Sequence, residues 1–235
     1  MKNKKLKSAV SLLAFLFVAS AANATIITGN LLNDAGFEST SSQGGQTSWP
    51  VSSNGSWGVG DAFSIVGSEN GINPLAGSKM LRFGNDSSST DIYQIIDVSS
   101  YATEIDAGLV SANFSAYYNS FNSPDGYVGL RIVGWSAEPE NFSGIDLLEG
   151  NYWDALLTDN DQSTWQQVSD SALLTNGLRY LAIGIHAQDD QNQAPRTYVD
   201  QTSLTLSIAE VPEPASLALF GLGLLGLRLR KRIVI

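Results

Sequence analysis

Aromatic and planar polar side chains on alternating segments are the residues of this sequence best suited to binding chemistry. Such segments contain Tyr127 and Arg131, Tyr180 and His186, and Tyr117. A sugar ring stacks on an exposed aromatic face, and planar polar groups beside it bind its hydroxyls. These five residues therefore predict a glycan-binding surface. Four tryptophans in or near expected loops add to the set: Trp49, Trp57, Trp135 and Trp153. The structural alternative is that the tryptophans pack in a core and the tyrosines only cover strands.

Catalytic chemistry has little support. His186 is the only histidine and no Gly-x-Ser-x-Gly turn precedes it, so a Ser-His-Asp triad lacks its other parts. A glycosidase needs two carboxylates roughly 5 to 10 Å apart, and among 23 acidic residues some pair meets that spacing by chance. The absence of cysteine excludes a thiolate nucleophile, Cys-ligated zinc and disulfides. We therefore expect no catalytic residues.

Two short motifs resemble ligand loops but lie in the wrong context. Residues 221–226 read Gly-x-Gly-x-x-Gly inside an apolar run, not between a strand and a helix, so we exclude dinucleotide binding. Residues 159–163 have the acidic spacing that opens an EF-hand loop. Thr164 stands where glycine is needed and Asp170 where glutamate is usual, so we interpret this stretch as a solvated loop.

Short alternating segments must position the candidate side chains. Gly, Asn, Asp and Ser clusters separate them at intervals typical of β-sandwiches. In residues 112–118, alternation places Phe114 and Tyr118 on a core face. We predict an all-β fold, a single jelly-roll β-sandwich of about nine strands over residues 25–208. Residues 151–157 fit either a helical turn or an extra strand. The strand candidates are 31–32, 57–66, 79–83, 92–98, 111–118, 127–132, 165–169, 180–186 and 198–207.

The first 24 residues have the features of a secretory signal peptide. Four lysines precede an apolar segment, and Ala22-Asn23-Ala24 supplies a small-x-small cleavage site. We predict cleavage after Ala24 by signal peptidase, so the chain crosses the inner membrane.

The last 25 residues combine a Pro-Glu-Pro tripeptide, an apolar run and a basic end. Pro212, Glu213 and Pro214 form an extended spacer, because each proline restricts both itself and the residue before it. We expect residues 215–227 to form a hydrophobic transmembrane helix, shorter than the ~20 residues of a relaxed span. The basic residues 228–232 hold the end in the cytoplasm. The segment looks like a removable address, with an ordinary anchor as the alternative.

This tail, residues 209–235, resembles the PEP-CTERM sorting signal of Gram-negative bacteria. The resemblance implies export, transient retention in the inner membrane and cleavage near Pro212, Glu213 and Pro214 by an exosortase. It also implies delivery to the cell surface or extracellular matrix of a cell that makes exopolysaccharide.

The body between the two ends is strongly acidic. The chain has 13 Lys and Arg against 23 Asp and Glu, and residues 1–24 and 228–235 hold four cations each, so residues 25–227 carry five cations against 23 anions, a net of −18. Such a body does not attract nucleic acid or anionic lipid, so we expect no nucleic-acid partner. Solubility outside the cell and divalent cation binding are the two explanations of this charge.

The ends of the body resemble those of galactose-binding-like jelly rolls, which include many carbohydrate-binding modules. Asn30 to Glu38 is similar to their opening motif, and Tyr198 to Leu204 to their closing strand. The resemblance implies that the two motifs are neighbours and that a structural Ca²⁺ is held there by Glu38 and Asp200, since calcium prefers hard oxygen ligands. The alternative is that Glu38 caps a turn and Asp200 accepts backbone N–H bonds.

These patterns together predict an exported, noncatalytic cell-surface protein that binds exopolysaccharide glycans. Two alternatives stay open. One is a purely structural surface or matrix protein without a specific ligand, and the other is a secreted glycan-acting hydrolase.

Overall fold

The computed structural model describes residues 25–42, 57–60, 62–83, 89–121, 126–139, 148–150, 156–157, 159, 161–189 and 197–210. Within them, Thr25–Glu210 forms one compact unit. The predicted signal peptide, the Pro-Glu-Pro motif and the apolar run 215–227 lie outside the described residues. Of the helices in these ranges, none has the length and apolar character needed to cross a membrane.

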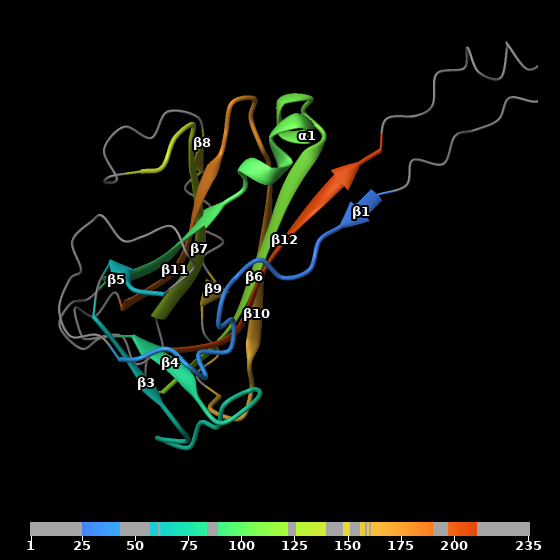
Figure 1. Cartoon of the computed structure of the whole chain (residues 1–235). Helices are drawn as coiled ribbons and strands as arrows, with labels where there is room; N and C mark the ends of the chain where they lie inside the picture. Colours follow the sequence, from blue (N-terminus) through green and yellow to red (C-terminus); the bar gives the residue numbers. More distant parts are fainter. Residues whose placement is uncertain are drawn as a thin grey trace, which may run out of the picture. The chain divides into compact units, whose positions relative to one another are not determined.

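The described residues contain twelve strands in two six-stranded antiparallel sheets (Figure 1). Sheet A consists of β1 (Thr25–Ile27), β3 (Phe63–Val66), β4 (Met80–Phe83), β6 (Val110–Ser120), β10 (Gln166–Leu173) and β12 (Thr197–Ala209). Sheet B consists of β2 (Val59–Gly60), β5 (Ser89–Asp97), β7 (Gly126–Trp135), β8 (Leu148–Gly150), β9 (Leu156–Leu157) and β11 (Tyr180–Asp189). A 3-10 turn (Ser99–Tyr101) and the helix α1 (Ala102–Asp106) connect β5 to β6.

The order of sheet A is β10-β6-β12-β4-β3, with β1 paired to β12, and that of sheet B is β2-β5-β11-β7-β8, with β9 paired to β7. Alternating residues of β6 are buried, and Phe114 and Tyr118 point into the core. They join Leu130 and Ile183 of sheet B in one apolar cluster. The Tyr118 hydroxyl crosses the sandwich and donates a 2.6 Å hydrogen bond to the Gly129 carbonyl. The predicted all-β jelly-roll sandwich is confirmed.

Some predicted strands differ from those observed. Residues 57–66 form two strands, β2 and β3, in different sheets, because each pairs with a different neighbour. Residues 31–32 are not a strand, since the Asn30 side chain accepts the Leu32 N–H and turns the chain there. β1 was not predicted, and the strand alternative holds for residues 156–157.

The opening and closing motifs meet, as the resemblance implied. The Asn30 amide donates to the Thr202 carbonyl at 3.0 Å, and the N–H and hydroxyl of Thr202 both donate to the Ala35 carbonyl at 2.9 Å. The register between β12 and β6 shifts between Asp200 and Ser203, where Gln201 has a φ of 49°. This bulge therefore frees the Thr202 backbone to bind the opening segment.

Candidate functional site

Four of the five predicted glycan residues lie on the outer face of sheet B. Tyr127 and Arg131 come from β7, and Tyr180 and His186 from β11, on the face opposite the core residues of these strands. Tyr117 lies on β6 of sheet A, paired with Gln167 and Asp200. The structure therefore places Tyr117 on the other side of the sandwich, apart from the other four.

A polar network crosses the middle of this outer face, from β5 through β11 to β7. Arg131 Nη1 donates to the Tyr93 hydroxyl at 3.0 Å, and the Nδ1 atom of His186 lies 2.9 Å from Asp91 Oδ1. Gly184 pairs with both Tyr93 and Arg131. A Cβ atom on Gly184 would lie only 2.4 Å from Tyr93 Cε1, so the missing side chain makes room for the tyrosine ring.

Two members of the network are buried and two are partly exposed. The exposed fractions are 2% for His186 and 3% for Tyr93, whereas Asp91 and Arg131 are half-buried. Burial, and after it the charge of Asp91, raises the pKa of Tyr93 to about 12, although Arg131 acts in the opposite direction. The Tyr93 hydroxyl therefore stays protonated at neutral pH and holds Arg131 in place.

The accessible part of this face is smaller than the sequence predicted. Tyr127 is 36% exposed, and Arg131 and Tyr180 are half-buried. Trp135 belongs to a small apolar cluster with Ile95 and Val133 on this face. Trp57 is buried in the main core, with its ring 5.4 Å from that of Phe37, so Trp57 and Trp135, the two predicted tryptophans that are described, both pack structurally. Trp49 and Trp153 lie outside the described residues.

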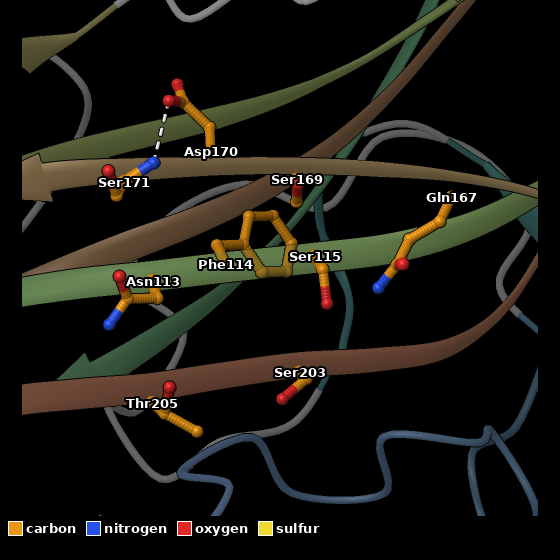
Figure 2. A pocket seen from close by; sticks show the side chains of 9 residues that line it. All are labelled: Asn113, Phe114, Ser115, Gln167, Ser169, Asp170, Ser171, Ser203 and Thr205. Atoms are coloured by element: carbon orange, nitrogen blue, oxygen red, sulfur yellow. Dashed lines mark hydrogen bonds between the residues drawn. The ribbon is translucent and has the colours of Figure 1, made fainter. Parts of the chain in front are cut away.

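Sequence reasoning missed a polar groove on the outer face of sheet A (Figure 2). It has a volume of about 440 Å³ and spans β10, β6 and β12. Alternation already pointed Asn113 and Ser115 away from the core, but only the register shows which residues join them. Its described lining residues are Asn113, Phe114, Ser115, Gln167, Ser169, Asp170, Ser171, Ser203 and Thr205.

The two predicted calcium ligands hold neighbouring parts of the loop 75–79. Glu38 Oε1 accepts the N–H groups of Ser78 at 2.8 Å and Lys79 at 3.0 Å, and Oε2 accepts the Ser78 hydroxyl at 2.8 Å. The N–H of Lys79, followed by that of Ser78, lowers the pKa of Glu38. Glu38 thus caps a turn, as the alternative interpretation had it.

Asp200 is fully buried. Its carboxylate accepts the N–H groups of Gln201 at 2.7 Å and Ala76 at 3.1 Å. Burial raises the pKa of Asp200, and these N–H groups oppose the rise. In the described residues no three His, Cys, Asp or Glu side chains converge on one point. Glu38 Oε1 already accepts two N–H groups, so Glu38 and Asp200 fit a calcium site only if backbone carbonyls complete it.

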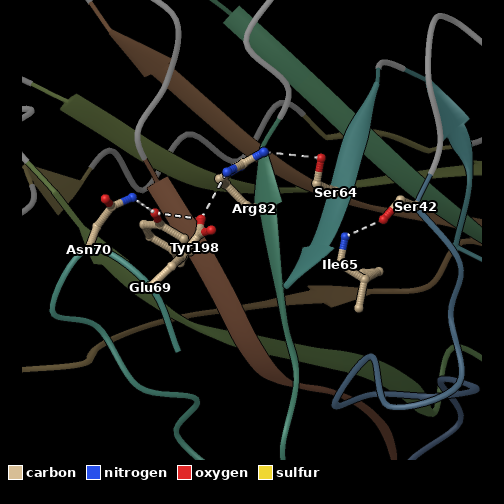
Figure 3. Close-up of polar contacts among 7 residues, drawn as sticks. All are labelled: Ser42, Ser64, Ile65, Glu69, Asn70, Arg82 and Tyr198. Atoms are coloured by element: carbon tan, nitrogen blue, oxygen red, sulfur yellow. Dashed lines mark hydrogen bonds and ion pairs between the residues drawn. The ribbon is translucent and has the colours of Figure 1, made fainter. Parts of the chain in front are cut away.

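Another polar cluster, built around the buried Tyr198, ties the loop after β3 to β12 (Figure 3). The Tyr198 hydroxyl donates to Glu69 at 2.9 Å and accepts from Asn70 at 2.7 Å, and Arg82 pairs with Glu69 at 3.0 Å. Burial raises the pKa of Tyr198 to about 12. Tyr198 is 1% exposed, so we interpret this cluster as structural.

Comparison with known families identifies the C-terminal segment. Residues 210–232 match the PEP-CTERM protein-sorting motif. The chain carries this sorting motif, which implies processing by an exosortase and export to the cell surface. No curated protein matches the chain.

Solved structures similar to this chain include two carbohydrate-binding modules and a cyclase. TmCBM61 in complex with β-1,4-galactotriose is 16% identical, with a TM-score of 0.46 over 75% of this chain and 98% of that chain. The CBM22-1 xylan-binding domain of Xyn10C from Paenibacillus barcinonensis is 11% identical, with a TM-score of 0.45 over 78% and 97%. The apo form of a cyclase from Fischerella sp. is 11% identical, with a TM-score of 0.47 over 79% and 98%. At such identities the similarity concerns the fold alone.

Proposed function

We propose that this protein is an exported, noncatalytic cell-surface or matrix component that binds exopolysaccharide glycans through the outer face of sheet B. The observation that supports this proposal is the series Tyr127, Arg131 and Tyr180 along that face, with Arg131 fixed by the Tyr93 hydroxyl.

The spacing of this series suits a chain of several sugars. Tyr180 pairs with Trp135, and Tyr127 precedes Trp135 by eight residues on β7. At ~3.4 Å per residue, the two tyrosines are about 27 Å apart. Arg131 lies between them and offers a planar set of donors to sugar oxygens. The series therefore favours an extended glycan over a single sugar.

The environment of His186 supports a noncatalytic role. A general base must reach the proton that it abstracts. His186 is 2% exposed and its Nδ1 atom lies 2.9 Å from Asp91, within the sheet rather than at an open surface. Turnover assays on the exported protein test this part of the proposal, and hydrolysis that is lost on an Asp91→Asn substitution would contradict it.

We expect the tail to be held transiently in the inner membrane until an exosortase cleaves near Pro212, Glu213 and Pro214. Mass spectrometry of the two ends of the exported protein measures this directly. We predict a mature N-terminus at Thr25 and a C-terminus near Pro214. A C-terminus at Ile235 would contradict the processing.

Binding is tested by calorimetric titration of the exported protein with oligosaccharides released from the polysaccharide of the producing cells. Aromatic stacking contributes ~0.5–1.5 kcal/mol per ring, so the double variant Tyr127→Ala, Tyr180→Ala should weaken this site by about 5- to 150-fold. Thr103→Ala is the control, because Thr103 is an exposed residue of α1 and lies outside both sheets. Unchanged binding by the double variant would refute the site.

A further inference from the structure

The groove on the outer face of sheet A carries chemistry that the proposed function does not use. We propose that it is a second glycan-binding surface, specific for uncharged, hydroxyl-rich chains, and that the protein uses its two faces to cross-link polysaccharide. The cross-linking part rests on the proposed function of sheet B, whereas the groove stands on its own geometry.

The groove is built from rows of neutral polar side chains. Ser115 pairs with Ser169 on one side and Ser203 on the other. In the next row, Asn113 pairs with Ser171 and Thr205. These hydroxyls and amides each donate and accept hydrogen bonds, as sugar hydroxyls do. The rows therefore offer complementary partners to a sugar chain lying across three strands.

The charge of the groove selects against anionic ligands. None of its described lining residues is a cation, and Asp170 is the one charged residue among them. Residues 25–227 have a net charge of −18, from five cations and 23 anions. An anionic polysaccharide would therefore be repelled, whereas a neutral glycan pays no such electrostatic cost.

The groove is open and its walls are held in place. Gln167, Ser169 and Ser171 are exposed. The Asn113 amide donates to the Ser207 hydroxyl at 2.8 Å, and the Ser171 N–H donates to Asp170 at 2.7 Å, the bond drawn in Figure 2. Strand pairing fixes the backbone beneath, so little ordering is lost on binding. The volume of about 440 Å³ lies in the range of small-molecule sites.

A second copy of this chain is a poor occupant of the groove. Stable protein interfaces have a core from which charged residues are depleted and in which aromatic residues are enriched. Here the one apolar lining residue, Phe114, is 1% exposed and belongs to the core. Two copies that each carry a net charge of −18 over residues 25–227 also repel each other.

The two surfaces face opposite directions. Ser115 lies on the outside of sheet A and Arg131 on the outside of sheet B, and the core cluster lies between the sheets. A stiff glycan on one face cannot reach the other, so two bound chains become linked through one protein. Linkage of this kind multiplies the strength of attachment without new contacts.

The test uses the exported, processed protein and neutral oligosaccharides released by partial hydrolysis of the producing cells' polysaccharide. Ser169→Tyr fills the groove from an exposed position. Asn113→Ala combined with Gln167→Ala removes its amides without adding bulk. Thr103→Tyr, at an exposed residue of α1 outside both surfaces, is the control. Circular dichroism and melting curves confirm that each variant is folded.

Calorimetry should give two oligosaccharides per wild-type protein, and the intact polymer should precipitate with it. Each groove variant should bind one oligosaccharide, with at least tenfold weaker affinity for the second, and should no longer precipitate the polymer. The control should behave as wild type. A different outcome is that one oligosaccharide binds per protein, the groove variants do not affect it, and the double variant Tyr127→Ala, Tyr180→Ala abolishes it. That outcome would refute the second site and leave the proposed function intact. If one oligosaccharide binds per protein and only the groove variants abolish this binding, the glycan site on sheet B and the cross-linking proposal are both refuted. No binding at all would overturn both.

Discussion

Replacing Gly184 by alanine should disturb the sheet B network more than any change of similar size elsewhere in the described body. A Cβ atom at this position would lie 2.4 Å from Tyr93 Cε1 and 3.3 Å from Arg131 Cβ. The Tyr93 ring is 3% exposed, and its hydroxyl accepts the 3.0 Å bond from Arg131. The ring must therefore move, and the bond that positions Arg131 is lost or lengthened.

The cost of inserting a methyl group into a packed site is ~1–3 kcal/mol. A domain of 150–250 residues loses ~2–4 °C of melting temperature per kcal/mol, so we expect Gly184→Ala to melt about 2–12 °C lower. Gly29→Ala is the matched control, because no atom lies within 4 Å of a Cβ atom at that position.

Differential scanning calorimetry of the two variants and the wild type measures the difference. Adding Tyr93→Leu to Gly184→Ala should recover part of the loss, since the clashing ring is gone, and the double-mutant cycle should show a coupling of at least ~1 kcal/mol. Equal melting temperatures for Gly184→Ala and Gly29→Ala would refute the packing argument. Independent, additive effects of the Gly184 and Tyr93 substitutions would refute it as well.

Three further predictions concern the opening motif. Gln94→Leu removes the 2.9 and 3.0 Å hydrogen bonds between the side-chain amide of Gln94 and the Asn33 backbone. It should lower the free energy of unfolding, measured in urea, by ~1–3 kcal/mol. An unchanged free energy would show that these bonds do not stabilise the opening motif. Because the pKa of Glu38 is lowered from 4.5, its stabilising effect is present above pH 4.5 and is lost as the pH falls through the folded pKa. Glu38→Gln should therefore flatten this part of the curve of stability against pH. A variant curve that runs parallel to the wild-type curve would contradict the capping role of Glu38. If calcium binds between Glu38 and Asp200, calcium at 100 times its Kd adds ~2.7 kcal/mol to the free energy of unfolding. Asp200→Asn should then abolish the difference in melting temperature between calcium and chelator. A wild-type protein without such a difference would refute the calcium proposal.

The sequence predicted the sandwich because alternation reports which side chains face the core. Phe114 and Tyr118 were placed correctly for this reason. Alternation does not report which sheet a strand joins, since sheet membership depends on pairing between distant segments. Tyr117 was therefore grouped with Tyr127 although the two lie on opposite sides of the sandwich.

Alternation also does not report how far an outer face is buried. His186 was correctly placed on the face away from the core, but it is 2% exposed and paired with Asp91. The groove on sheet A was missed for a different reason. Serines and threonines at alternating positions are the usual solvent-facing residues of a strand, and only the register of β10, β6 and β12 brings them together.

The most direct test of the central claim is nuclear magnetic resonance of tyrosine ring carbons in the exported protein, titrated with oligosaccharides from the producing cells' polysaccharide. Glycan binding on sheet B predicts that the ring signals of Tyr127 and Tyr180 shift with oligosaccharide concentration, while that of the fully buried Tyr118 stays unchanged. Unshifted Tyr127 and Tyr180 signals at saturating oligosaccharide would contradict the account.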